Sequence, residues 1–455
     1  MKIKLLHSTF ALALAVTVPA TVLLAQSAQQ KPAQSDQFKE LEEFLAVYKR
    51  VKTSYVDKVE DKQLMEGAIQ GMLASLDPHS GFLNKSDFNN LQTQIDGEYG
   101  GLGLSVTLED EAVKVIAPTK DTPADKAGIK SGDYITHLDG KLIYGGTLDE
   151  AVEAMRGVPG TAIKLTIIRP GRDAPFDVTI TRAIIDLKPV KWEVKDKIGL
   201  ITISGFSEDT GADVVAAITG VKKALGGNPL GYIVDLRSNP GGILGEAVAV
   251  SDAFLDSGEI VSERGRDKRD TQRYWAESAV PGDVAGGLPV IVLVDAGSAS
   301  ASEIVAGALQ DHHRGLVMGE RSFGKGSVQN VLPLTRDTGL RLTVARYHLP
   351  SGRSVQEGGI KPDIQVPQLS DPDYKKRVAI RETDLRRHLV NEVQADDKQL
   401  EEDVADDPRF AMTAEQLKTK GIEDFQLHYA METLTRLGSK TMKLADKPVK
   451  GKAQN

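Results

Sequence analysis

The chain contains no cysteine, and aromatic residues make up only 5% of its 455 residues. The absence of cysteine excludes disulfides, thiol catalysis and cysteine-ligated metal sites. The formal net charge is -8, so the charge balance gives no reason to expect nucleic-acid binding. The eight histidines lack the spacing of metal ligands, and the side chains of the adjacent His312 and His313 would diverge on a helix. We therefore expect neither a metal site nor a cofactor.

One long apolar run stands near the N-terminus. Lys2 and Lys4 precede an apolar stretch from residue 10 to 25, which ends in small residues. This order is typical of a secretory signal peptide. The length of the run also allows an uncleaved membrane anchor, although Pro19 interrupts it. Residues 1–28 therefore predict export to the periplasm, with either a cleaved signal peptide or an inner-membrane anchor.

Three serines stand between a predicted strand and a predicted helix. Residues 288–294 form a short apolar run rich in β-branched residues, which is typical of a buried parallel strand. The apolar residues within 304–309 recur at helical spacing. Ser298, Ser300 and Ser302 lie near the start of this helix, where unpaired N–H groups could form part of an oxyanion hole beside a nucleophile. The alternative is that these small residues only cap the helix.

A second stretch, residues 319–329, has low helix propensity and leads into a β-type sequence. Lys325 and Gln329 would share a face on a strand, because an even number of positions separates them. A lysine whose pKa is lowered by burial can act as a general base to serine. The stretch nearly matches a phosphate-binding P-loop, but Gly326 stands where Ser or Thr would ligate magnesium.

The serine run followed by Ser322-Phe-Gly-Lys-Gly-Ser-Val-Gln329 resembles the C-terminal processing peptidases, also called tail-specific proteases. In that family the nucleophile is the middle serine of the run and the base is a lysine 25 positions later, an interval that Ser300 and Lys325 match. The family's glutamine, which orients the lysine, falls on Gln329. The resemblance implies a serine endopeptidase that acts through a Ser/Lys dyad and an acyl-enzyme.

Residues 235–242, Asp-Leu-Arg-Ser-Asn-Pro-Gly-Gly, follow another predicted buried strand and also match the family. There, a glycine amide of this motif is the second oxyanion donor. We therefore expect the N–H groups of Ala301 and of Gly241 or Gly242, with Gly242 preferred, to hold the oxyanion. Repeated strand–helix units predict an α/β core over residues 185–368, and the resemblance specifies a ClpP/crotonase-like arrangement.

Upstream of this core, residues 97–184 resemble a bacterial PDZ domain. The loop Gly101-Leu102-Gly103-Leu104 opens the domain, a capping box at residues 147–150 begins its helix, and alternating strands close it. The resemblance implies that N–H groups of the loop bind a substrate's C-terminal carboxylate while the peptide adds as a strand. Arg156 is the candidate for signalling the PDZ position to Gln329; an ordinary exposed arginine is the alternative.

The two ends of the mature chain are expected to be helical. Residues 36–95 predict two short helices that resemble the family's N-terminal segment, which packs on the core and contributes to dimerisation. His79, which follows a proline, is interpreted as a turn residue rather than a ligand. Residues 370–455 predict charged helices with exposed faces and a polar tail, suited to a cap, a dimer contact or an adaptor-docking surface. We expect a homo-oligomer acting on protein or peptide substrates with free C-termini, and an adaptor requirement stays open.

Two alternatives concern the chemistry. A Ser-His-Asp hydrolase would combine His312 or His313 with Asp235 or Asp295, but His312 would project from the C-terminal end of the helix, away from the serine turn. A PDZ-bearing scaffold without activity is contradicted by the intact serine, lysine and glutamine. The sequence thus predicts a periplasmic serine endopeptidase of multi-domain α/β fold, with a small β-rich PDZ domain and helical terminal segments.

Overall fold

The computed structural model describes residues 33–109, 112–143, 145–267, 269–277, 282–377, 379–392 and 410–445. The predicted export segment, residues 1–28, and the end of the polar tail from residue 446 lie outside the described residues. The chain divides into two compact units, Met1–Ala68 and Ile69–Asn455. Within the described part of the chain, no helix combines the length and apolar character needed to span a membrane.

The helices are α1 (Ala33–Ser54), α2 (Asp61–Ala74), α3 (Lys85–Asp96), α4 (Pro123–Lys126), α5 (Leu148–Met155), α6 (Thr210–Ala224), α7 (Leu244–Asp252), α8 (Ala301–Asp311), α9 (Ala414–Thr419) and α10 (Phe425–Ala445), with 3-10 turns η1 (Tyr374–Lys376) and η2 (Glu382–Asp384). The strands before the core are β1 (Gly81–Leu83), β2 (Glu98–Gly101), β3 (Leu104–Glu109), β4 (Ala112–Pro118), β5 (Tyr134–Leu138), β6 (Lys141–Leu142), β7 (Ala162–Ile168), β8 (Phe176–Thr181) and β9 (Ala183–Asp186). Those of the core are β10 (Val190–Lys195), β11 (Ile198–Ile203), β12 (Gly231–Asp235), β13 (Gly258–Gly265), β14 (Thr271–Ala276), β15 (Val290–Val294), β16 (Gly315–Gly319), β17 (Ser327–Pro333), β18 (Gly339–His348) and β19 (Ile364–Gln365).

The first unit contains α1, whose predicted apolar face includes Phe38, Leu41 and Leu45. These three side chains are exposed. The Tyr48 hydroxyl donates to Asp61 at the start of α2, at 2.6 Å. Helix α1 therefore presents an apolar face that the rest of its own unit leaves open.

A six-stranded sheet in the order β10-β11-β12-β15-β16-β19 forms the centre of the larger unit. All neighbours pair in parallel except β10, which is antiparallel to β11 at the edge. On β15, Val290, Val292 and Val294 join the apolar cluster with α6, α7 and α8, whereas Ile291 and Leu293 join the cluster with α9 and α10. Because helices cover both faces, the strand is apolar throughout, as the sequence predicted.

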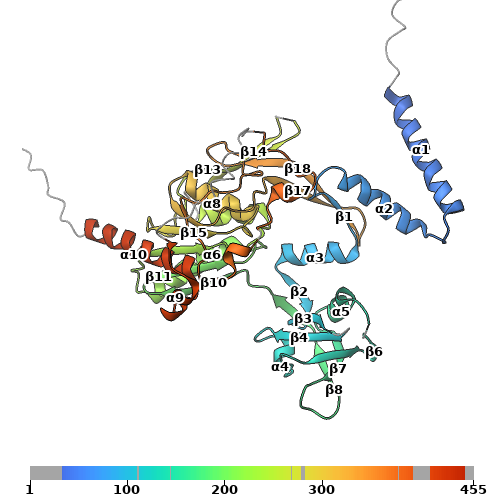
Figure 1. Cartoon of the computed structure of the whole chain (residues 1–455), viewed down its shortest axis with the longest axis horizontal. Coiled ribbons are helices and arrows are strands. Elements are labelled where there is room, and N and C mark those ends of the chain that lie inside the picture. Colours follow the sequence, from blue (N-terminus) through green and yellow to red (C-terminus); the bar gives the residue numbers. More distant parts are fainter. Residues whose placement is uncertain are drawn as a thin grey trace, which may run out of the picture. The chain divides into compact units, whose positions relative to one another are not determined.

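A second, antiparallel sheet in the order β1-β18-β13-β14, with β17 on β18, lies on the other side of α8 (Figure 1). Its outer strand β1 comes from the N-terminal segment, where Gly81 pairs with Arg341 of β18. The sequence predicted only two helices over residues 36–95, but this segment also supplies β1 and the helix α3. A strand of three residues is too short to produce a recognisable alternation.

The predicted PDZ region forms its own sheet, β3-β4-β5-β7-β8 with β6 on β5, around a separate apolar core. Strands β2 and β9 pair where the chain enters and leaves this domain. The predicted capping box begins α5: Thr147 N–H donates to Glu150 at 3.0 Å, and Glu150 N–H donates to Thr147 Oγ1 at 3.2 Å. The entry strand β2 begins at Glu98 and the exit strand β9 ends at Asp186, while the limits of 97–184 stay a prediction.

The C-terminal segment differs from its prediction as charged helices with exposed faces. Leu417, Phe425 and Leu434 of α9 and α10 are buried against the parallel sheet. Residues 379–392 are irregular apart from η2, yet Glu382 within them is fully buried. Helix α10 thus buries one face in the core and exposes Glu432, Thr435 and Arg436 on the other, whereas residues 379–392 are not helical apart from η2.

Candidate active site

Ser300 lies at the turn between β15 and α8, as the sequence predicted. It is the N-cap residue of α8 and has φ 54° and ψ -112°. A serine at positive φ is strained, and such strain persists only where the surrounding structure imposes it. The turn is fixed by Asp295, whose Oδ1 accepts hydrogen bonds from the N–H groups of Gly297 at 2.9 Å and Ser238 at 2.8 Å.

The three serines of the run differ in their surroundings. Ser298 and Ser302 are fully buried. The Ser298 hydroxyl donates to the Leu236 carbonyl at 2.8 Å, and the Ser302 hydroxyl donates to the Asn239 carbonyl at 2.9 Å. Both therefore join the turn to the loop that follows β12, whereas Ser300 alone of the three is partly exposed. The structure thus distinguishes Ser300 independently of its interval to Lys325.

A buried carboxylate, Glu303, joins the serine turn to the lysine loop. Its Oε2 accepts from the N–H groups of Ser300 at 2.8 Å and Lys325 at 3.0 Å. Its Oε1 accepts from the Ser322 hydroxyl at 2.6 Å and from Gly324 N–H at 2.7 Å. Burial raises the pKa of Glu303 to about 7, and the four donors oppose this increase. Glu303 thus fixes the two segments relative to one another.

Tyr347 of β18 makes a second link between the same two segments. Its hydroxyl donates to the carbonyl of Ser300 at 3.2 Å and also contacts the carbonyl of Lys325. Burial, with smaller contributions from nearby carboxylates, raises the pKa of Tyr347 well above its usual value, so the phenol remains a donor.

The sequence motifs predicted no role for Glu303 or Tyr347. The Ser-x-x-Glu spacing of a capping box could have identified Glu303, because Ser300 begins a helix. No local signal indicated Tyr347, whose contact comes from a strand 47 residues further along the chain.

Lys325 lies in the loop before β17, which begins at Ser327. The prediction that Lys325 and Gln329 share a strand face is therefore wrong, because only Gln329 lies on the strand. Burial lowers the pKa of Lys325 to about 8, with a smaller contribution from Arg341. Three carboxylates, of which Glu382 contributes most, act in the opposite direction. A pKa near 8 leaves part of this lysine neutral near neutral pH, which is the form that a general base requires.

Gln329 lies on β17, but its amide nitrogen points to other partners than the lysine. It donates to Ser327 Oγ at 2.9 Å and to Thr343 Oγ1 at 3.3 Å. The pairing of β17 with β18 shifts register between Val328 and Gln329. No hydrogen bond of the described residues joins Gln329 to Lys325, so its lysine-orienting role stays a prediction.

The predicted oxyanion donors lie on adjoining segments. Gly241 N–H already donates to Asn239 Oδ1, at 2.9 Å. Within the described ranges, no hydrogen bond uses the N–H of Gly242 or of Ala301, the first residue of α8. A Cβ placed on Gly241 would lie 2.9 Å from Ser300 Cβ and 3.0 Å from Ala301 N. The loop containing Gly241 therefore packs directly on the turn that carries Ser300. Because the Gly241 N–H already has an acceptor, Gly242 is the better candidate for the second oxyanion donor.

The predicted carboxylate-binding loop joins β2 to β3. Gly101 ends β2, Leu104 begins β3, and Leu102 and Gly103 connect them. The whole loop lines a cavity of about 420 Å³, together with Val152, Met155 and Arg156 at the end of α5 and three residues of α3. The lining is mixed, with the apolar side chains of Leu104, Val106 and Met155 beside polar residues of α3. A cavity beside β3 is suited to a peptide that adds to the sheet as a strand.

Arg156 lies at the edge of this cavity and contacts both Tyr99 of β2 and Thr93 of α3. Its guanidinium is 5.1 Å from the centroid of the Tyr99 ring, and Nη1 donates to Thr93 Oγ1 at 3.4 Å. The hydrogen bonds of the described residues do not connect Arg156 with Gln329. The predicted coupling is therefore not made in this conformation.

The structure does not bring the residues of the Ser-His-Asp alternative together. His312 bonds the Glu259 carbonyl at 2.7 Å from the far end of α8, about 18 Å along the helix from Ser300. His313 is exposed. Asp235 is paired with Arg237 at 2.6 Å. These contacts contradict a triad built from these histidines.

Comparison with known proteins agrees with this geometry. Residues 197–366 match the Peptidase family S41, residues 100–180 match the PDZ domain, and residues 8–87 match the N-terminal domain of the activating protease CtpB. The carboxy-terminal-processing protease of Bartonella bacilliformis is 47% identical over 377 residues, which cover 82% of this chain and 86% of that protein. CtpB of Bacillus subtilis is 35% identical over 364 residues, which cover 78% and 72%.

Among solved structures, the photosystem II D1 C-terminal processing protease is 30% identical and has a TM-score of 0.43, with 72% of this chain and 86% of that chain covered. The mixed α/β core and the PDZ domain predicted from the sequence are confirmed. The chain belongs to the carboxy-terminal-processing proteases of peptidase family S41. It is a serine-type endopeptidase.

Proposed function

We propose that this endopeptidase cleaves its substrates through a dyad of Ser300 and Lys325. Ser300 Oγ attacks the scissile carbonyl while neutral Lys325 takes its proton, and the lysine returns this proton to the leaving amine. The resulting acyl-enzyme is hydrolysed by water, from which Lys325 again removes a proton. The N–H groups of Ala301 and Gly242 hold the oxyanion in both steps.

One observation carries this proposal: Glu303 binds the backbone N–H groups of both Ser300 and Lys325, at 2.8 and 3.0 Å. Tyr347 links the carbonyls of the same two residues. Two buried side chains that share these partners hold a nucleophile and a base in a fixed relation, as general-base catalysis requires. The lowered pKa of Lys325 supports the same assignment.

We further propose that the PDZ domain binds the C-terminal residues of substrates along the loop Gly101-Leu102-Gly103-Leu104. The apolar part of the lining, formed by Leu104, Val106, Val152 and Met155, supports a substrate with apolar C-terminal side chains. Arg156, at the edge of the cavity, remains the candidate to report its occupancy to Gln329.

The exposed apolar face of α1 supports self-association into a homo-oligomer. The basic and apolar pattern of residues 1–28 supports export to the periplasm.

The dyad is tested with the protein lacking residues 1–28 and an unfolded substrate that ends in apolar residues. Ser300→Ala and Lys325→Ala should each abolish cleavage, whereas the double variant His312→Ala/His313→Ala should retain it. A slowly hydrolysed ester substrate should add one acyl group to Ser300 in the wild type, detected by intact mass, and none in Ser300→Ala. Full activity of Lys325→Ala would exclude the dyad.

Cell fractionation tests the location. The full-length protein should appear in the periplasmic fraction if residues 1–28 are removed, or in the inner-membrane fraction if they remain. N-terminal sequencing distinguishes the two cases. Recovery in the cytoplasm with an intact N-terminus would contradict export.

A further inference from the structure

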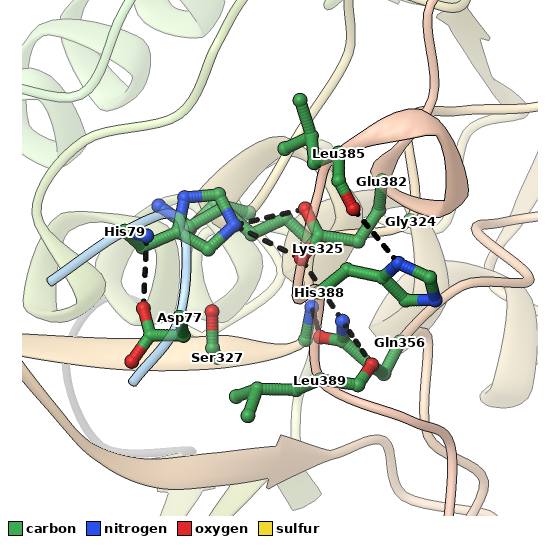
Figure 2. A network of polar contacts seen from close by, with 12 residues as sticks. Asp77, His79, Gly324, Lys325, Ser327, Gln356, Glu382, Leu385, His388 and Leu389 are labelled. Atoms are coloured by element: carbon green, nitrogen blue, oxygen red, sulfur yellow. Dashed lines mark hydrogen bonds and ion pairs between the residues drawn. The ribbon is translucent and has the colours of Figure 1, made fainter. Parts of the chain in front are cut away.

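Two distant parts of the chain meet beside Lys325. His79, in the turn before β1, and Glu382, in η2, come from segments 303 residues apart. The Nε2 atom of His79 lies 2.9 Å and 3.0 Å from the two carboxylate oxygens of Glu382. The Glu382 side chain is fully buried and that of His79 is 14% exposed. Figure 2 shows the pair next to the side chain of Lys325.

Both members of the pair are held in place from more than one side. Asp77 Oδ1 accepts from the N–H of His79 at 2.8 Å, as expected for a turn residue, and the His79 carbonyl accepts from Arg341 Nε at 2.8 Å. Gln356 donates to Glu382 at 3.0 Å and accepts from Gly326 N–H at 2.9 Å. The carboxylate of Glu382 is thus tied to the lysine loop through a single side chain.

The charged groups around Lys325 come from four elements. Arg341 of β18 lowers the pKa of the lysine, and Glu382, Glu303 of α8 and Asp77 of the turn raise it. Among the carboxylates Glu382 contributes most, and it is the one that a histidine contacts. The electrostatic effect of Glu382 on Lys325 therefore depends on the contact that His79 makes with this carboxylate.

We propose that the His79–Glu382 pair is a positioning device that sets the protonation of the general base: His79 holds and screens the Glu382 carboxylate, which would otherwise draw a proton onto Lys325. This inference rests on the proposed function, because it assumes that Lys325 is the base. Neither residue touches the substrate in this role. Both act through the lysine.

A purely structural role explains the pair less well. A buried ion pair contributes little net stability, because desolvation of the two charges offsets their attraction. An apolar pair would dock the C-terminal segment at least as firmly. A buried carboxylate beside a lysine that must lose its proton is instead unfavourable unless a cationic or hydrogen-bonding partner compensates its charge. His79 is placed to do so.

The test is the pH dependence of kcat/KM, measured with the full-length protein on a peptide substrate. Glu382→Gln removes the negative charge, so the rising part of the profile should move to lower pH by about 1 unit, which gives about a fivefold higher rate at pH 7 relative to the plateau. His79→Ala leaves the charge of Glu382 unscreened, so the profile should move to higher pH, with about a tenfold lower relative rate at pH 7. In the double variant the effect of His79→Ala should disappear.

A control pair of the same kind lies on α10, away from Glu382. His428 pairs with Glu432 at 3.5 Å, and neither residue is among the main groups that act on Lys325. His428→Ala should therefore leave the position of the profile unchanged. Circular dichroism of each variant establishes that it is folded, and if His79→Ala does not fold, Glu382→Gln alone decides.

The outcomes separate the two proposals. Opposite displacements of the profile support the inference. If Glu382→Gln does not move the pH profile, the inference is wrong, even if the rate falls at every pH. That result would not affect the proposal of the Ser300/Lys325 dyad. A Lys325→Ala variant that remains active overturns the dyad itself. If His79→Ala is inactive at every pH and Glu382→Gln keeps the wild-type pH profile, His79 has a different role and the inference is again wrong.

Discussion

The substitution Glu303→Gln tests how the nucleophile and the base are held together. The carboxylate accepts four hydrogen bonds and donates none, two at each oxygen. An amide of the same shape has only one acceptor oxygen. If this oxygen serves Ser300 and Lys325, the NH₂ group faces Ser322 and Gly324. The Ser322 hydroxyl can turn and accept, but the Gly324 N–H keeps no acceptor.

The expected loss of stability follows from the Gly324 N–H, the one buried donor without an acceptor in the variant. Leaving it unsatisfied costs about 1–3 kcal/mol, so the variant should unfold at a lower denaturant concentration yet remain folded in water. The loop containing Lys325 should shift, and a displacement of about 1 Å between reacting groups costs roughly 100-fold in rate. We therefore expect kcat/KM of Glu303→Gln to fall about 100-fold, mainly through kcat.

The assay compares Glu303→Gln with Glu150→Gln. Glu150 completes the same kind of capping box on α5 but accepts a single N–H, from Thr147 at 3.0 Å, which an amide oxygen can also accept. Its substitution should leave kcat unchanged.

Because the pKa of Glu303 is raised to about 7, this residue becomes protonated as the pH falls through 7. The difference between wild type and Glu303→Gln should therefore shrink at acid pH. Wild-type kcat in Glu303→Gln at pH 8 would refute the role given to this carboxylate.

Three further predictions concern the same site. With Lys325 titrating at about 8, kcat/KM should rise about tenfold between pH 7 and 9 and then level off, whereas an unperturbed lysine would give a rise that continues beyond pH 10. Gly241→Ala should lose activity by at least about 100-fold, since its Cβ would lie 2.9 Å from Ser300 Cβ, while Gly245→Ala, whose nearest neighbour would be 4.0 Å away, should keep it. Ser302→Ala should lower the free energy of unfolding by about 1 kcal/mol and retain cleavage; an inactive Ser302→Ala would contradict the assignment of Ser300 as nucleophile.

Local patterns allowed much of the fold to be predicted. The strand, turn and helix around Ser300 follow from a β-branched apolar run, small residues and helical spacing, all within about twenty positions. The capping box at Thr147 was read from four residues, and the PDZ domain from the order of its elements. In each case the residues that define the structure are neighbours in the sequence.

The remaining parts depend on contacts between distant segments, which no local pattern encodes. The hydroxyl of Tyr347 reaches Ser300 across 47 residues, and His79 meets Glu382 across 303. The position of Gln329 relative to Lys325 was mispredicted for a similar reason: the strand begins only after the lysine, and a shift of register with β18 determines where the glutamine amide lies.

These distant contacts make the chemistry of Lys325 a property of the whole fold rather than of its own loop. The turn carrying His79, the strand β18 and the segment 379–392 all contribute charged groups to the surroundings of the buried lysine. Residues 379–392 are attached at several points: Glu382 bonds His79 and Gln356, Arg381 donates to the carbonyls of Arg321 and Ser322, and the Asn391 N–H donates to Glu357 at 2.8 Å. Loss of this segment would expose Lys325 to water, restore its ordinary high pKa and leave it protonated at neutral pH. The base would then be lost although Ser300, Lys325 and the oxyanion donors remained in the chain, because burial is the main cause of the lowered pKa of Lys325.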